Sequence, residues 1–96
     1  MKTITLQFFA DPGHGWLKVA KTNKILNTIL DKISNFSFES DTHLFLEEDC
    51  DAGLFIQALH NNGYSKEQIK IKYYSSNRSS KIRGYSRYIY KVGCNR

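Results

Sequence analysis

The stretch QIKIKYYS, residues 68–75, indicates which kind of sheet this chain builds. Its odd-numbered positions carry two isoleucines and a tyrosine before the final serine, and its even-numbered positions carry two lysines and a second tyrosine after the glutamine. Because successive side chains of a strand point to opposite faces, this alternation predicts a half-buried strand with a basic outer face. We therefore expect a sheet that packs its apolar face under helices and turns its other face outward.

Patterns on either side of this stretch complete an α+β fold. Alternating segments predict five more strands, at residues 2–9, 16–20, 35–39, 42–47 and 85–92. Apolar residues with helical spacing predict one helix after the N-cap candidate Thr22 and a second that stops at Gly63. The expected order is β-β-α-β-β-α-β-β, in a mostly antiparallel sheet with two helices packed on one face. Residues 1–96 should form a single domain.

The same periodicities indicate which side chains fill the core. A domain of 96 residues has room for one core, so each large apolar side chain contributes a substantial part of the stability. We expect burial of Trp16, Phe36, Phe38, Leu44, Leu46, Leu54, Ile69 and Ile71.

Positive charge is concentrated in the last third of the chain. Residues 65–96 hold nine Lys or Arg and one Glu, a net charge of +8, whereas residues 1–64 carry −3. Five of the six tyrosines lie in the same third. Cations attract phosphates and flat rings stack on bases, but Tyr and Arg also suit protein interfaces, and a basic edge strand can simply be solvated. The candidate binding surface consists of Lys70, Lys72, Tyr74, Arg78, Lys81, Arg83, Tyr85 and Arg87.

The segment RSSKIRGY, residues 78–85, is the most pronounced basic part of this surface. On a strand, Lys81 and Arg83 would share the outer face while Ile82 turned inward. Serine hydroxyls and loop amides would add hydrogen-bond donors for phosphate.

The loop DPGHGW, residues 11–16, is a second candidate site. Its proline and two glycines indicate a tight turn, and His14 between the glycines should be exposed. The imidazole could exchange protons near neutral pH, with Asp11 to orient it. Alternatively, the loop binds a ligand without chemistry, or it only joins two strands while Trp16 fills the core.

The acidic residues Glu47, Glu48, Asp49 and Asp51 form a third candidate site. Carboxylates are ligands that Mg²⁺ prefers, but consecutive positions on a strand alternate between two faces and cannot all converge. Capping of the following helix and contact with a basic partner are the alternatives. The chain has no zinc-ligand spacing, Walker loop or dinucleotide motif, so we expect no metal and no cofactor. The two cysteines, at positions 50 and 94, should be free thiols.

Three stretches of the chain resemble a group of small phage and prophage proteins. They are DPGHGWLKV at residues 11–19, LEEDCD at residues 46–51 and RSSKIRGY at residues 78–85. Because they lie near the start, the middle and the end of the chain, the resemblance covers a whole domain. It implies a phage or mobile-element origin and an accessory role, such as interference with host defence.

Together these features favour a binding protein over an enzyme. The first hypothesis is a phage accessory protein that inhibits a host nucleoprotein defence complex, as anti-CRISPR proteins do, through the basic, tyrosine-rich surface. The first alternative is direct binding of nucleic acid. The second is a small phosphate-acting enzyme with His14 as acid/base and Arg83 as charge clamp. We expect a monomer or weak homodimer. We place it in the host cytoplasm, because no apolar run predicts a membrane span and no export signal is present.

Overall fold

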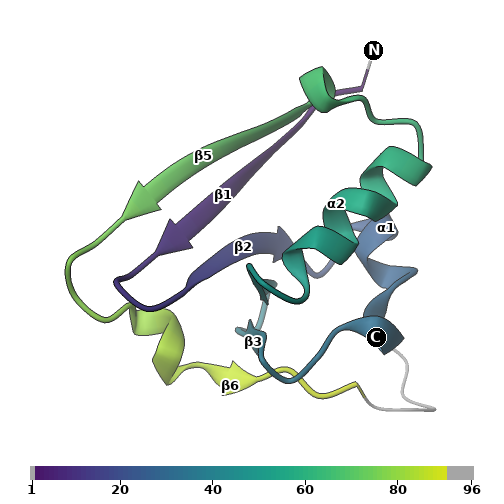
Figure 1. Ribbon diagram of the computed structural model, residues 1–96. Coiled ribbons are helices and arrows are strands. Elements are labelled where there is room, and N and C mark those ends of the chain that lie inside the picture. Colours follow the sequence, from purple (N-terminus) through teal and green to yellow (C-terminus); the bar gives the residue numbers. More distant parts are fainter. Residues whose placement is uncertain (1, 91–96) are drawn as a thin grey trace.

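A six-stranded mixed sheet is the framework of the computed structural model, which describes residues 2–90 (Figure 1). The strands are β1 (Ile4–Ala10), β2 (Gly15–Ala20), β3 (Phe38–Glu39), β4 (His43–Glu47), β5 (Ile69–Ser75) and β6 (Ser86–Arg87). They lie side by side in the order β5-β1-β2-β4-β3-β6. Neighbouring strands are antiparallel, except that β1 and β5 run parallel.

Two α-helices and three short 3-10 helices connect these strands. They are α1 (Lys24–Asn27), η1 (Leu30–Lys32), α2 (Ala52–Asn61), η2 (Lys66–Gln68) and η3 (Lys81–Gly84). Asn23, and not Thr22, caps α1, because its Oδ1 accepts a hydrogen bond from the Leu26 N–H at 2.9 Å. Gly63 follows α2 with a φ of 93°, a left-handed conformation that favours glycine. No helix within residues 2–90 is long and apolar enough to cross a membrane.

The expected topology is wrong in two respects. The sheet is mixed and not mostly antiparallel, because β5 pairs in parallel with β1. Their register runs from Ile4 opposite Ile69 to Ala10 opposite Ser75. The expected order β-β-α-β-β-α-β-β also fails, because η1, η2 and η3 interrupt it. The strand expected at 35–39 begins only at Phe38, and the strand expected at 85–92 is reduced to β6, with residues 91 and 92 outside the described part. Alternation shows which face of a strand is buried, but not which neighbour it pairs with.

One face of the sheet packs against both α-helices. Strands β1, β2 and β4 contribute alternate side chains to this core, and α1 and α2 contribute the residues of their inner sides. Ile69 and Ile71 of β5 pack at its margin and are only partly buried. The buried residues of this cluster are Leu6, Leu17, Val19, Leu26, Ile29, Ile33, Leu44, Leu46, Ala52, Phe55, Ala58, Leu59 and Tyr88.

The opposite face has a smaller aromatic core beneath η3. Trp16, Phe38 and Phe45 from the strands pack there against Ile82 of η3. The burial expected for Trp16, Phe38, Leu44 and Leu46 is confirmed. Phe36 and Leu54 were expected to be buried, and this is wrong, because they are 57% and 38% exposed. Phe36 lies in the turn before β3, where the alternation of a strand does not apply.

Candidate functional site

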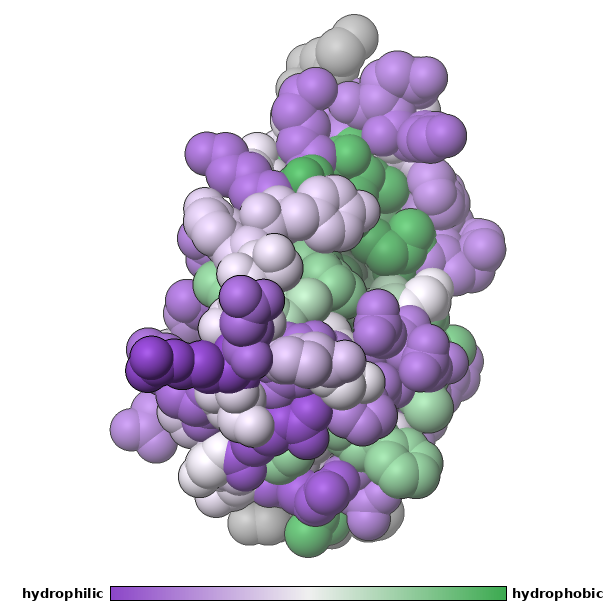
Figure 2. All heavy atoms as spheres, turned by 60° about the vertical axis from the view of Figure 1, so that its left-hand side comes forward, coloured by the Kyte–Doolittle hydropathy of each residue, from purple (hydrophilic) through white to green (hydrophobic). Residues whose placement is uncertain are grey.

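The sheet face opposite the helices carries polar and charged side chains on β5. Lys70, Lys72 and Tyr74 occupy this face, as the alternation predicts, because Ile69 and Ile71 of β5 pack on the helix side. Hydrophilic side chains cover most of the β5 side of the molecule, and hydrophobic ones are visible only in patches between them (Figure 2).

A row of side chains runs across three adjacent strands of this face. Residues paired between neighbouring strands point to the same side of a sheet. The register aligns Lys72 of β5 with Gln7 of β1, and Gln7 with Lys18 of β2. The sequence patterns did not single out Lys18 as a binding residue, although its alternation with Leu17 and Val19 in β2 already indicated this face.

A hollow of about 460 Å³ lies on this face over β1, β2 and β5, and we call it the sheet-face hollow. Its polar and aromatic lining includes Thr5, Gln7, Lys18, His43, Lys72 and Tyr74, and no Asp or Glu is among its described lining residues. Desolvation, followed by the charge of Lys18, lowers the pKa of His43 from its ordinary value. With Lys18 and Lys72 and no carboxylate among its described lining residues, the sheet-face hollow carries positive charge.

An aromatic pair borders the sheet-face hollow. The rings of Tyr74 and Phe9 stack with 5.2 Å between centroids and 16° between planes. Phe9 packs against the aromatic core, whereas Tyr74 is 44% exposed. Phe9 thus supports one face of the Tyr74 ring, and the exposed tyrosine lies beside the lysines as a surface on which a base can stack.

The basic segment at residues 78–85 is not a strand, so the condition under which Lys81 and Arg83 would share a face is not met. It contains the 3-10 helix η3, in which the Ser80 hydroxyl accepts a hydrogen bond from the Ile82 N–H at 3.1 Å. Ile82 is buried as expected, but Lys81 and Arg83 do not share the outer face of a strand. Lys81 is exposed, and Arg83 turns back onto the sheet.

Asp11 clamps the β1–β2 loop to η3. Its carboxylate accepts two hydrogen bonds from Arg83, from Nε at 2.6 Å and from Nη2 at 2.8 Å. It also accepts bonds from the backbone N–H groups of Gly13, His14 and Ser80. The Arg83 guanidinium, then the Ser80 N–H, hold the pKa of Asp11 well below its usual range, and Asp11 in turn raises the pKa of Arg83. Both residues, predicted as site candidates, therefore hold the structure together.

The side chains of the acidic run, which consists of Glu47, Glu48, Asp49 and Asp51, do not converge on one point. Glu47 is buried, bonds His14 Nδ1 at 3.3 Å and accepts from the Asp49 N–H at 3.0 Å. The partner of the His14 ring is thus Glu47, and not Asp11 as we expected. Glu48 and Asp49 are exposed. Within residues 2–90, no group of three or more His, Cys, Asp or Glu side chains is arranged to hold a metal ion.

Asp51 is a buried structural residue. It accepts hydrogen bonds from the N–H and the hydroxyl of Ser34 and from the hydroxyl of Ser37. It occupies the N-cap position of α2, but its side chain makes no capping bond to the helix. Asp51 therefore ties the turn before β3 to the start of α2, in place of the helix capping expected for it.

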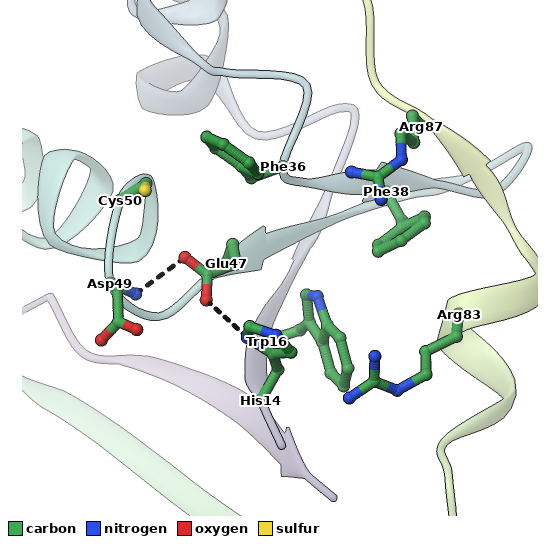
Figure 3. A pocket seen from close by; sticks show the side chains of 9 residues that line it. All are labelled: His14, Trp16, Phe36, Phe38, Glu47, Asp49, Cys50, Arg83 and Arg87. Carbon is green, nitrogen blue, oxygen red and sulfur yellow. Dashed lines mark hydrogen bonds and ion pairs between the residues drawn. The ribbon is translucent and has the colours of Figure 1, made fainter.

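A pocket of about 260 Å³ lies where the β1–β2 loop, the acidic run and the segment around β6 meet (Figure 3). We call it the Trp16 pocket, and its lining consists of His14, Trp16, Phe36, Phe38, Glu47, Asp49, Cys50, Arg83 and Arg87. The sequence patterns predicted five of these residues, His14, Glu47, Asp49, Arg83 and Arg87, as parts of separate candidate sites. Nothing in the patterns showed that they surround one pocket. Arg87 lies with its guanidinium 5.1 Å from the Phe38 ring centroid and donates to the Asn35 carbonyl at 2.9 Å.

The Trp16 pocket contains no activated thiol. Desolvation, then the hydrogen bond to Glu47, raise the pKa of Cys50, so that the thiolate is disfavoured. Cys94 lies outside the described residues.

The remaining predicted residues lie near the pocket and beyond it. Tyr85 packs its ring against Phe45 at 5.1 Å, and Arg78 is exposed in the loop after β5. Comparison of the chain with protein-family models, curated proteins and solved structures finds no match. The functional argument therefore starts from the geometry of these surfaces.

Proposed function

We propose that this protein acts by binding single-stranded nucleic acid through the open face of its sheet. The observation that carries this proposal is the sheet-face hollow, where Lys18 and Lys72 lie beside the exposed ring of Tyr74 without a lining carboxylate. Lysines neutralise phosphates, and an aromatic ring stacks on any base.

A single strand fits this surface better than a duplex does. Stacking on Tyr74 requires a base whose face is free, and bases in a duplex already stack on one another. Lys70 and Lys72 lie two residues apart on β5 and point to the same face, so they can contact phosphates along a strand laid across the sheet. Thr5 and Gln7 of β1, which pair with Lys70 and Lys72, supply polar groups beside them.

We further propose that the nucleic acid belongs to a host nucleoprotein defence complex. An accessory role of this kind follows from the resemblance to phage proteins that we inferred from residues 11–19, 46–51 and 78–85. A surface that occupies exposed single strands would block such a complex without chemistry. No observation favours catalysis by His14, whose ring faces the buried Glu47.

Salt dependence of binding tests the contact with phosphate. A labelled single-stranded oligonucleotide would be titrated with protein and followed by fluorescence anisotropy. If Lys18, Lys70 and Lys72 each neutralise one phosphate, affinity should fall about 20-fold between about 50 and 200 mM salt. Lys72→Gln should make the logarithmic slope shallower by about 0.7. Lys24→Gln is the matched control, because Lys24 is exposed on α1, on the covered side of the sheet.

Tyr74→Ala separates stacking from charge. It should weaken binding by about 1–3 kcal/mol at every salt concentration and leave the slope unchanged. Desolvation is the main cause of the lowered pKa of His43, and the charge of Lys18 is the second. A bound phosphate would offset the charge of Lys18, so binding should raise this pKa, measured by NMR titration. The proposal is wrong if no oligonucleotide binds at low salt, or if Lys72→Gln and Lys24→Gln change the slope equally.

Capture from host lysate tests the defence-complex part separately. The tagged protein should retain a nucleoprotein complex, and nuclease treatment should release it. If the complex stays bound after nuclease treatment and also binds the Lys72→Gln variant, the contact is made by protein elsewhere on the surface. That result would contradict the proposal that the nucleic acid of a defence complex is bound.

A further inference from the structure

The indole N–H of Trp16 is a buried donor that lacks a partner. Trp16 is 1% exposed, and its Nε1 has no hydrogen-bond partner among residues 2–90. Buried donors are nearly always paired, so an unpaired one needs an explanation. Trp16 lines the Trp16 pocket, and in Figure 3 the indole nitrogen lies at the end of the ring that faces the space between Glu47 and Phe38. A ligand oxygen in that space would satisfy it.

The two sides of the Trp16 pocket carry opposite charges. Arg83 and Arg87 lie on one side of Trp16, and Glu47 and Asp49 lie on the other (Figure 3). Each guanidinium has five N–H donors, more than the bonds to Asp11 and to the Asn35 carbonyl use. The pocket therefore offers donors for an oxyanion at one end and carboxylate acceptors for an N–H group at the other.

Planar groups form the walls between these two ends. The Arg83 guanidinium lies 5.3 Å from the Trp16 ring centroid, and that of Arg87 covers Phe38. Phe36 is largely exposed at the rim, which leaves its ring available for stacking. The volume of about 260 Å³ is below the range of about 300–1,000 Å³ that is typical of drug-sized ligands. The pocket is therefore too small for a drug-sized ligand, and a ligand the size of a mononucleotide would place its base at the open rim beside Phe36.

We propose that the Trp16 pocket binds a single nucleotide whose base carries an exocyclic amino group. The phosphate accepts hydrogen bonds from the Trp16 Nε1–H and the Arg87 guanidinium, and the base stacks on Phe36. The amino group donates to Asp49, as carboxylates accept from the amino group of cytosine. This inference does not depend on the sheet-face hollow, because the two sites share no lining residue.

The indole N–H resonance gives a direct test, because Trp16 is the only tryptophan of the chain. The ¹⁵N-labelled protein would be titrated with AMP, CMP, UMP, adenosine and inorganic phosphate. AMP and CMP should move the indole cross-peak downfield to saturation, and UMP should bind about tenfold more weakly because it lacks the amino group. Adenosine and phosphate alone should each bind more weakly than AMP.

Variants at exposed positions identify the contacts without disturbing the core. Phe36→Ala should weaken AMP binding about 5- to 160-fold through lost stacking. Asp49→Ala should abolish the preference for AMP over UMP, whereas Asp41→Ala, at another exposed acid, should retain it. Lys72→Gln should leave AMP binding unchanged, which separates this site from the sheet-face hollow. An unmoved indole cross-peak overturns the inference, as does an equal shift with inorganic phosphate alone, which would indicate a simple oxyanion site.

Discussion

Gly15→Ala should destabilise the protein through one specific contact. Gly15 opens β2 and pairs with Ala10 of β1. A Cβ atom at this position would lie 2.4 Å from Phe8 Cζ, 2.6 Å from Phe8 Cε1 and 3.3 Å from Glu48 Cδ. Carbon atoms prefer separations of about 3.5–4.0 Å, so the Phe8 ring would have to move by about 1 Å. Among the described residues, Gly63 is the one glycine with positive φ, so the effect at Gly15 comes from packing and not from the backbone.

The cost follows from how Phe8 is held. Its ring packs against the main core and lies 5.6 Å from the ring of Tyr73. Inserting a methyl group into such a packed site costs about 1–3 kcal/mol. Each kcal/mol lowers the Tm of a domain of this size by about 4–8 °C. Urea unfolding followed by circular dichroism gives the free energy, and thermal unfolding gives the Tm.

Gly53→Ala is the matched control and should have the opposite sign. Gly53 is the second residue of α2, and a Cβ there would meet nothing within 4 Å. Alanine in a helix is favoured over glycine by about 0.5–1 kcal/mol, so this variant should be more stable than the parent. If Gly15→Ala is as stable as the parent, Phe8 is not held against β2 as described, and the packing argument is refuted.

Two further predictions concern the residues around the Trp16 pocket. Phe38→Ala should lower the free energy of unfolding by about 3–5 kcal/mol, because Phe38 is only 8% exposed. Phe36→Ala, at an exposed position, should change the free energy of unfolding by less than about 0.5 kcal/mol. Equal losses for the two variants in urea unfolding would contradict the burial of Phe38. Asp11→Asn should lower the Tm at neutral pH, because it removes the negative charge and one of the two oxygens that accept from Arg83. The folded pKa of Asp11 is depressed, so its stabilisation is complete above the ordinary pKa of about 3.9 and is lost as the pH falls below it. The Tm difference between parent and variant should therefore narrow below about pH 4, and a constant difference across that range would argue against the clamp.

The alternation at residues 68–75 was enough to place the lysines of β5. Lys70, Lys72 and Tyr74 share one face because successive side chains of any strand point to opposite sides. The burial of Trp16 and Phe38 also followed from local patterns. Side-chain direction and burial at these positions depend on neighbours in the sequence, so local patterns are enough to predict them.

Local patterns could not decide between a strand and a 3-10 helix for residues 81–84. Ile82 turns inward in both structures, so its burial does not distinguish between them. The difference comes from Asp11, which holds the backbone N–H of Ser80 and the side chain of Arg83 from 69 and 72 positions away. A contact over such a distance leaves no periodic signal in either segment.

By itself, the sequence determined which faces of the strands are apolar, where charge accumulates and which side chains enter the core. Only the tertiary structure decided that β5 pairs in parallel with β1, that Lys18 joins the row of Lys72, and that Trp16 shares a pocket with Arg87. The physical reason is that side-chain direction is a property of a few consecutive residues, whereas strand partners and pockets arise when distant segments close around a common core.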